Sequence, residues 1–257
     1  MTLYFGKLPA KRDSRDLLLA SYLDDSKLPK IPATFGHQTA FPRAGWGMLG
    51  NDEFGDCAIA GPAHETMLWT KLGGHYATFT TAGVLSDYSA ITGFDPHAGP
   101  PGENPTDQGS NVRDVARYRQ TVGMKDAHGR RHKIGAYVAL DPRNEAHVRA
   151  AVYLFDGIGL GFMVPDSAME QFNAGEPWDV VPGAQIEGGH YVPIVGVTAS
   201  GPVCVTWGRV QGMTWDFFGA YADESYAYLS TEALTGGKSP EGFDVAALKL
   251  DLAAVRG

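Results

Sequence analysis

Cysteine is scarce in this sequence, which has only Cys57 and Cys204 among 257 residues. Two cysteines cannot build the disulfide framework that holds small secreted proteins together. Free thiols are typical of a reducing compartment, so we expect a cytoplasmic protein. The N-terminal residues agree with this expectation, because they lack the charged-then-apolar order of a signal peptide.

Basic residues and long apolar runs are also in short supply. The chain has 21 Lys and Arg residues against 29 Asp and Glu residues, which gives a formal net charge of −8. A nucleic-acid-binding face needs a basic stripe, and the densest basic cluster, residues 129–133, is short. No apolar run approaches the length of a membrane-spanning helix, which is about 20 residues. We therefore expect neither a nucleic acid nor a membrane as a partner.

Metal-binding and cofactor-binding motifs are missing as well. The sequence contains no HExxH and no CxxC, the spacings in which histidine and cysteine pairs commonly hold zinc. The glycines at 157–161 lack the spacing and the surrounding βαβ unit of a dinucleotide-binding fingerprint. We therefore predict a protein that uses no metal ion and no cofactor.

The patterns that are present change along the chain. Residues 51–130 carry helical patterns, whereas residues 131–235 carry short alternating or apolar runs bounded by Gly and Pro. This order predicts an α+β fold in a single domain, 1–257, with an N-terminal helical half, a C-terminal antiparallel β half and the site between them. Residues 1–50 are expected to form an extended arm, and residues 236–257 a C-terminal tail.

Periodicity and capping residues predict the individual elements. Helices are expected at 16–23, 56–72, 111–122 and 144–157. Ser110 or Asn111 is placed to cap the third of these helices, and Gly123 to end it. Strands are expected at 133–140, 158–165, 190–197, 201–207 and 226–230.

Cys57 stands where the helix at 56–72 is expected to begin. The unpaired N–H groups and the positive end of the helix dipole favour a thiolate there, so we expect a lowered pKa and a reactive sulfur. A cysteine nucleophile also needs a base, usually a histidine. His64 lies two turns further along the same helix and is out of reach. His190 follows two glycines at the start of a predicted strand, where a substrate backbone has room to approach.

The spacing of these residues resembles that of the papain-like cysteine peptidases. His190 follows Cys57 by 133 residues, within the roughly 130–150 residues expected for that family. Asn51 lies six residues before the cysteine, where the family has a side-chain amide, and Gly55 lies two residues before it. Trp207-Gly208 follows the two apolar strands after the histidine, as in the family.

This resemblance, which covers about residues 40–230, implies a papain-like fold and a thiol hydrolase that cleaves a peptide or another amide bond. Cys57 would attack the carbonyl carbon, and His190 would move the proton. Asn51 and the backbone N–H of Cys57 would stabilise the oxyanion. The implied partner is a peptide or protein substrate.

The resemblance also assigns residues that hold the substrate. Gly109 matches the family's glycine-containing edge, which hydrogen-bonds the substrate backbone. Gly189, directly before the histidine, leaves space for that backbone, and Trp207 is expected to line the same site.

The sequence departs from the family at the residue that orients the histidine. The family has an Asn two residues before the Trp, and that position is Val205, which cannot accept a hydrogen bond. Thr206 is a candidate replacement, but strand alternation places it on the opposite face from Val205, so its use would need a local bulge. Gln211, a backbone carbonyl or a water molecule are the alternatives. Asp56, beside the cysteine, is a second departure and opposes thiolate formation.

Two functions therefore remain open. The first is a peptidase or amidase that uses a Cys57–His190 dyad. The second is a papain-fold protein with weakened catalysis that serves in binding or assembly, with another assembly component as its partner. The lack of a signal peptide and of the family's long pro-segment favours a bacterial or phage-encoded protein. If the protein is phage-encoded, the virion is an alternative location to the cytoplasm.

Overall fold

The computed structural model describes residues 3–11, 13, 16, 18–21, 30–42 and 45–233. The expected C-terminal tail, residues 236–257, lies outside the described residues. Of the short helix expected at 16–23, the described part contains a single 3₁₀ turn, Leu19–Ser21. The other expected helices and strands all fall within the described ranges.

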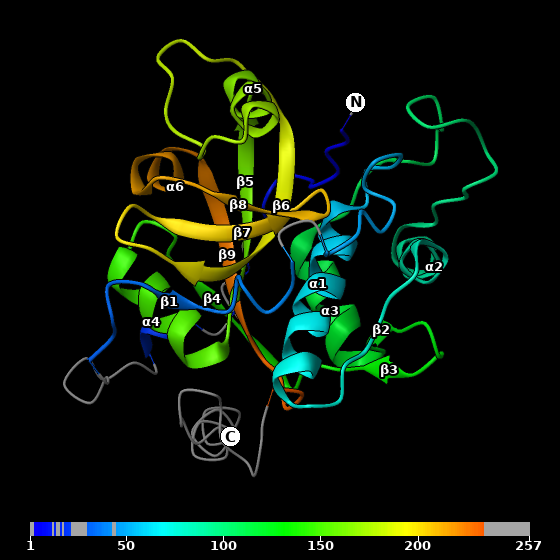
Figure 1. Cartoon of the computed structure of the whole chain (residues 1–257). Helices are drawn as coiled ribbons and strands as arrows, with labels where there is room; N and C mark the ends of the chain where they lie inside the picture. The colour runs from blue at the N-terminus through cyan, green and yellow to red at the C-terminus, as the bar shows by residue number, and fades with distance from the viewer. Residues whose placement is uncertain are drawn as a thin grey trace.

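The described part combines six α-helices with one large antiparallel sheet, which confirms the predicted α+β class (Figure 1). The helices are α1 (Cys57–Leu72), α2 (Thr81–Thr92), α3 (Val112–Thr121), α4 (Glu145–Phe155), α5 (Asp166–Ala174) and α6 (Trp215–Tyr221). The strands are β1 (Phe35–Gly36), β2 (Met124–Lys125), β3 (Arg131–His132), β4 (Ala136–Leu140), β5 (Ile158–Pro165), β6 (Ile186–Val197), β7 (Pro202–Thr206), β8 (Arg209–Gly212) and β9 (Ala222–Leu229).

The large sheet has the strand order β4-β9-β5-β6-β7-β8, and every neighbouring pair in it is antiparallel. The short strand β1 pairs with the far end of β6, and β2 and β3 form a separate hairpin. Figure 1 shows α1, α2 and α3 gathered on one side of the sheet and α4, α5 and α6 around its other side. Helix α1 packs mainly on β6, so this strand joins the two halves.

Helix α1 is buried along almost its whole length, from Cys57 to Thr70. Small residues make this close packing on β6 feasible. At Gly61, a Cβ atom would lie 2.6 Å from the ring of Tyr191, so only glycine lets the helix approach the strand this closely. The helix continues through Pro62, although a proline there lacks the N–H that would bond the preceding turn.

The remaining helices divide into those that the sequence predicts and those that it does not. Helix α3 begins after Asn111, whose side chain accepts a hydrogen bond from the N–H of Arg113, so Asn111 and not Ser110 is its cap. Helices α2, α5 and α6 are absent from the prediction because each of them buries few apolar residues and so shows little apolar periodicity. None of the helices in the described ranges is both long enough and apolar enough to cross a membrane.

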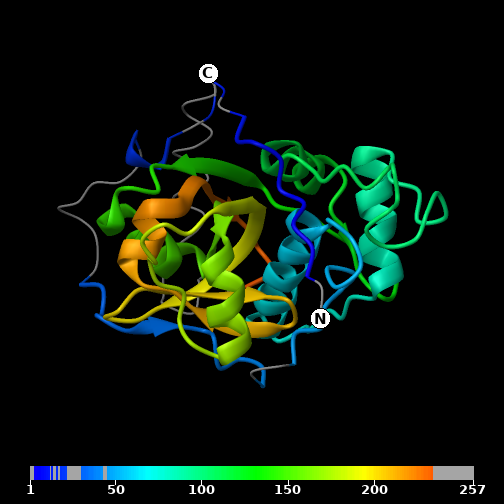
Figure 2. The ribbon, with the colours of Figure 1, turned by 90° about the horizontal axis from the view of Figure 1, so that it is seen from above.

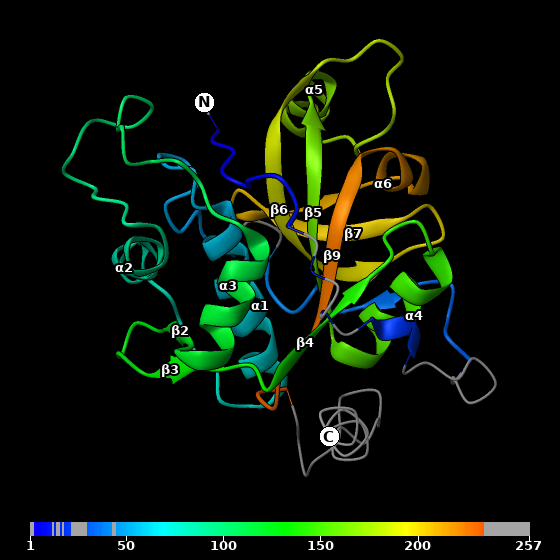
Figure 3. The same cartoon turned by 180° about the vertical axis from the view of Figure 1, so that it is seen from behind.

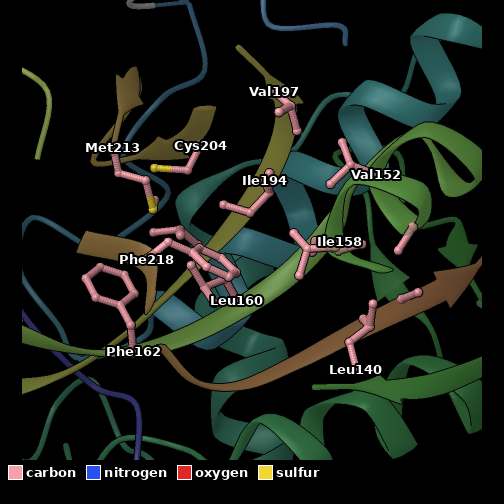
Figure 4. Packing of buried hydrophobic residues seen from close by; sticks show 14 of the residues in the cluster. Leu140, Val152, Ile158, Leu160, Phe162, Ile194, Val197, Cys204, Met213 and Phe218 are labelled. Atoms are coloured by element: carbon pink, nitrogen blue, oxygen red, sulfur yellow. The ribbon is translucent and has the colours of Figure 1, made fainter. Parts of the chain in front are cut away.

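Two apolar cores occupy the two faces of the sheet. Successive residues of a strand point to opposite faces, and along β6 Val192 and Ile194 enter one core while Tyr191 enters the other. Figure 4 shows the first core, in which Cys204 lies beside Met213. The second core lies between α1 and the sheet and contains Cys57. The two cysteines therefore belong to different cores.

A buried ion pair ties the helical half to the sheet. The guanidinium of Arg119 on α3 lies 2.6 Å from the carboxylate of Glu65 on α1, and both side chains are almost fully buried. The hydroxyl of Tyr191 on β6 donates a hydrogen bond to the same carboxylate, at 2.8 Å. One carboxylate thus connects α1, α3 and the strand that carries His190.

We predict that Glu65→Ala destabilises the protein by about 3–5 kcal/mol, because it leaves Arg119 buried without its partner. Urea unfolding followed by fluorescence measures this change in the free energy of unfolding. Lys11→Ala is the matched control, since it breaks the exposed Lys11–Asp114 pair and should cost less than about 1 kcal/mol. Equal losses for the two variants would show that the buried pair does not hold the halves together.

Candidate active site

Cys57 is the first residue of α1 and is almost fully buried. The backbone N–H groups of Tyr191 on β6 and of Gly6 near the start of the chain lie close enough to its sulfur to lower the pKa of the thiol. The sulfur therefore lies near the peptide unit that links His190 to Tyr191. Helix α1 therefore places Cys57 beside β6, the strand that carries His190.

The expected lowering of the Cys57 pKa is wrong for this state of the protein. Burial raises the pKa of Cys57 to about 12, and the two backbone N–H groups oppose that rise only in part. Asp56, which was expected to oppose the thiolate, makes a smaller contribution than burial. Asp56 is itself buried, and burial together with the charge of Asp107 raises its pKa well above its ordinary value. The sulfur is therefore a protonated thiol at neutral pH.

His190 lies on β6 with its ring buried, and burial lowers its pKa to about 3. Its Nε2 atom lies 2.7 Å from Oγ1 of Thr206, which is the first of the orienting contacts that the sequence suggests. Its Nδ1 atom has no hydrogen-bond partner among the described residues, so no hydrogen bond joins it to Cys57 there. When Nε2 donates its proton to Thr206, Nδ1 carries a lone pair and can accept a proton.

Thr206 reaches His190 without the bulge that was expected beside it. Ile194 on β6 pairs with Cys204 on β7. His190 and Thr206 are each an even number of residues away from that pair, so they lie on the same face of the sheet. Val205 enters the opposite core. The register between β6 and β7 does shift, but beyond Ile194, away from the histidine.

Trp207 and Gly208 form the two-residue turn between β7 and β8. Their φ angles are 42° and 73°, and positive values at both positions are typical of the type I′ turns of tight hairpins. The turn stacks the indole of Trp207 on the ring of His190, with 4.4 Å between centroids and 17° between planes. Gln211, the other side-chain candidate for orienting the histidine, donates to two backbone carbonyls elsewhere.

Asn51 lies just before α1, and its side-chain amide is buried. The amide donates to the carbonyl of Phe54 at 3.0 Å, which fixes its orientation. It also donates to the carbonyl of Tyr4 at 3.2 Å. Asn51 thus presents one N–H to a carbonyl oxygen of another stretch of chain beside Cys57.

The space in front of Cys57 is filled by residues 3–8, which we call the N-terminal segment. Figures 2 and 3 show this segment, in dark blue, crossing between α1 and the sheet. The N–H of Lys7 donates to the carbonyl of Gly189 at 3.0 Å, and the N–H of Ser110 donates to the carbonyl of Gly6 at 2.7 Å. The segment is therefore held through its backbone by both halves of the protein.

Glycines make this close approach feasible. A Cβ atom on Gly6 would lie 1.6 Å from the carbonyl oxygen of Gly55. Cβ atoms on Gly109 and Gly189 would each lie 2.3 Å from a carbonyl oxygen of the segment. Both glycines that were expected to hold a substrate backbone therefore contact the N-terminal segment in this structure.

The backbone hydrogen bonds that were expected at Gly109 are made by the next residue, Ser110. The N–H of Gly109 donates to the hydroxyl of Tyr88 at 2.9 Å, so this group is already occupied. Ser110 makes the backbone hydrogen bonds to the segment instead. The sequence gives no sign of the roles of Gly6 and Ser110, because neither periodicity nor composition shows which loop an irregular segment will meet.

Little open space remains at the site while the segment is in place. Cys57, Asn51 and Thr206 line one cavity of about 10 Å³, which is barely enough for one water molecule. His64 also lines this cavity, although it lies two turns along α1. Its Nε2 atom is 3.0 Å from the carbonyl of Gly47, and burial lowers its pKa to about 4. The site is closed in this state.

Comparison with solved structures identifies the fold. The structure is similar to xylellain, a cysteine protease from Xylella fastidiosa, with a TM-score of 0.67 and 15% sequence identity over 89% of this chain and 97% of that one. It is also similar to digestive procathepsin L2 from Tenebrio molitor (TM-score 0.60, 14% identity, 88% and 78% of the chains) and to procathepsin B S9 from Trypanosoma congolense (0.58, 12%, 89% and 86%). No protein-family model and no curated protein matches the sequence. The predicted papain-like fold is confirmed.

We predict that Gly6→Ala displaces the N-terminal segment, because the added methyl group would overlap the carbonyl of Gly55. An exposed cysteine has a pKa of about 8.5, so the thiolate fraction of Cys57 at neutral pH should rise by more than about 100-fold. Iodoacetamide labelling with sites mapped by mass spectrometry measures the change. Cys204, buried in the other core, should stay unlabelled.

Gly219→Ala on α6 is the matched control, since a Cβ atom there meets no atom within 4 Å. It should label as slowly as the unaltered protein. A Gly6→Ala protein whose Cys57 stays unreactive would show that the N-terminal segment does not control access to the thiol.

Proposed function

We propose that this protein is a thiol hydrolase that cleaves a peptide or other amide bond and is held inactive by its own N-terminal segment. The observation that carries the proposal is the way this segment is bound. A stretch of polypeptide lies across Cys57 and is held through its backbone by Gly189, Ser110 and the amide of Asn51. Such a site is suited to a peptide or protein substrate. The cysteine proteases among its structural neighbours support the same reading.

The reaction follows from the groups around Cys57 once the segment has left. Cys57 gives its proton to Nδ1 of His190, and its sulfur attacks the carbonyl carbon of the substrate. The amide of Asn51 and the backbone N–H of Cys57 stabilise the oxyanion. The His190 imidazolium then protonates the leaving amine as the C–N bond breaks, which leaves a thioester on Cys57. Water, deprotonated by His190, hydrolyses the thioester and releases the acid.

The N-terminal segment is placed to cover the sulfur and not to be cleaved. The group that faces the sulfur of Cys57 is the N–H of Gly6, whereas attack requires a carbonyl carbon. The carbonyl at the amide of Asn51 belongs to Tyr4, which is two residues away from Gly6. The nucleophile and the oxyanion donor therefore face different peptide units, an arrangement that does not favour hydrolysis of the segment.

The covered state also keeps both reacting groups neutral. Burial raises the pKa of Cys57 to about 12 and lowers that of His190 to about 3, so the proton stays on the sulfur. Release of the segment would return water to both groups and remove part of the cost of charging them. The two pKa values then move toward each other, and proton transfer from sulfur to ring becomes easier.

A non-catalytic role in binding or assembly is the second candidate. One observation favours it, namely that no hydrogen bond joins Cys57 to His190 in the part of the chain that the structure describes. Catalytic hydrogen bonds are often long without substrate and tighten in the complex. The segment, moreover, occupies the position from which a substrate would draw the two residues together. Hydrolysis therefore remains the function that the geometry supports best.

We predict that the Gly6→Ala protein hydrolyses quenched-fluorescent peptides and that the unaltered protein hydrolyses them far more slowly. In the Gly6→Ala background, Cys57→Ala should abolish hydrolysis, and Asn51→Ala should lower kcat/KM by about 10²–10³ through loss of an oxyanion donor. Asn173→Ala, an exposed change on α5, is the matched control and should leave the rate unaltered. Hydrolysis that survives Cys57→Ala would overturn the proposal.

Thr206 gives a second kinetic test in the same background. Thr206→Val removes the acceptor for Nε2 of His190 and should slow acylation by about three- to tenfold, the worth of one hydrogen bond. Thr206→Ser keeps the hydroxyl and should restore most of the rate. Equal rates for the Val and Ser variants would show that Thr206 does not orient the ring.

A further inference from the structure

The side chain of Lys7 is fully buried although it belongs to an irregular segment near the start of the chain. Its Nζ atom lies 2.7 Å from Oδ2 of Asp223 and 3.3 Å from Oε1 of Glu224, and it also donates to the carbonyl of Leu8. A lysine is almost never fully buried unless it is paired. The protein therefore contains a pocket that accepts a cationic side chain close to Cys57.

The walls of this pocket come from the sheet. Asp223 and Glu224 stand near the start of β9, and Gly161 on β5 is paired with Glu224. A Cβ atom on Gly161 would lie 2.2 Å from Cε of Lys7, so this glycine leaves the space that the aliphatic part of the lysine fills. Because none of these wall residues belongs to the N-terminal segment, the pocket remains when the segment leaves.

The pocket offers more acceptors than Lys7 uses. The side chain of Glu224 is only 6% exposed. Its Oε2 atom and Oδ1 of Asp223 have no hydrogen-bond partner among the described residues. Burial raises the pKa of Glu224 to about 7, and the charge of Lys7 opposes that rise. Without Lys7, two carboxylates would share a largely buried site with no counter-ion, a state that any bound cation relieves.

The pocket also adjoins open space. A cavity of about 710 Å³ lies next to it, between the chain that follows the segment and strands β4 and β9, with Asp223 and Glu224 in its wall. This space gives room for a side chain longer than lysine. A guanidinium presents five donors in a planar fork, which suits a pair of carboxylates at least as well as an ammonium does.

We propose that the Asp223–Glu224 pocket selects substrates that carry a lysine or arginine side chain beside the cleaved bond. This inference rests on the proposed function and assigns a substrate class to that site. Lys7 directly follows Gly6, whose N–H faces the sulfur of Cys57. A substrate bound through the same backbone contacts places a side chain in the pocket next to, or one residue removed from, the bond that is cleaved.

The kinetic test uses the Gly6→Ala protein and sets of quenched-fluorescent peptides that differ at one position. Each set carries Lys, Arg, norleucine or Glu there, and the position is moved along both sides of the bond. Norleucine matches the length of lysine without its charge. At one position, kcat/KM for Lys or Arg should exceed that for norleucine by at least about tenfold, and Glu should be the poorest.

Substitution of the acidic residues that line the pocket should remove the preference for Lys or Arg over norleucine. Glu224→Gln should bring the ratio of kcat/KM for Lys over norleucine close to one. Glu170→Gln, an exposed change on α5, is the matched control and should keep the ratio. Asp223→Asn, at a side chain that is 27% exposed, serves as the second variant if Glu224→Gln does not fold. A lysine preference that persists in these variants would overturn the inference.

A binding measurement separates this inference from the proposed function. The Gly6→Ala, Cys57→Ala protein cannot be acylated at Cys57, and calorimetry can follow its binding of the peptide LYFGKLPA, the sequence of residues 3–10. This peptide should bind at least about tenfold more tightly than its norleucine analogue, and Glu224→Gln should cancel the difference.

The two measurements fail in different ways. A lysine preference in binding that depends on Glu224 supports the pocket even where no peptide is hydrolysed, and in that case the hydrolase proposal fails alone. If neither hydrolysis nor binding distinguishes lysine from norleucine, the inference about the Asp223–Glu224 pocket is overturned, whereas the proposal that the protein is a hydrolase stands. If the peptide does not bind at all, the inference about the pocket is overturned as well.

Discussion

One close backbone approach, between Gly6 and the carbonyl of Gly55, governs the state of this site. A Cβ atom at position 6 would lie 1.6 Å from that oxygen, so only glycine lets the N-terminal segment lie on the loop that precedes Cys57. Three consequences follow: the sulfur is buried, its pKa rises, and its neighbour His190 stays neutral. The same approach places the following residue, Lys7, in the acidic pocket of the sheet.

Strand β6 links this covered site to the stability of the whole protein. His190 and Tyr191 are consecutive, and they point to opposite faces of the sheet. The backbone N–H of Tyr191 lowers the pKa of the nearby Cys57 thiol, while its hydroxyl donates a hydrogen bond to Glu65, the carboxylate that Arg119 neutralises. Cysteine and histidine are therefore positioned by one strand that is anchored in the helical half. The chemistry and the packing of the two halves depend on the same contacts.

The sequence predicts the parts of the site that depend on local signals and on order along the chain. Cys57 at a helix start is an example. The contact of Thr206 with His190 was suggested, but with a bulge that the structure lacks, because the face of Thr206 follows from its pairing across the sheet and not from Val205. The covering segment could not be predicted, since it depends on contacts between residues far apart in sequence. Because the segment buries the sulfur, the expected low pKa of Cys57 was wrong.

Detection of an acyl-enzyme tests the central claim most directly, namely that Cys57 is a nucleophile covered by the N-terminal segment. The protein is mixed with the p-nitrophenyl ester of an N-acyl lysine, quenched in acid within the first turnover, and digested for mass spectrometry. The Gly6→Ala protein should release p-nitrophenol in a stoichiometric burst and carry the acyl group on Cys57, whereas the unaltered protein should acquire it far more slowly. A Gly6→Ala protein with no acyl group on Cys57, or equal rates of acylation for the two proteins, would contradict the claim.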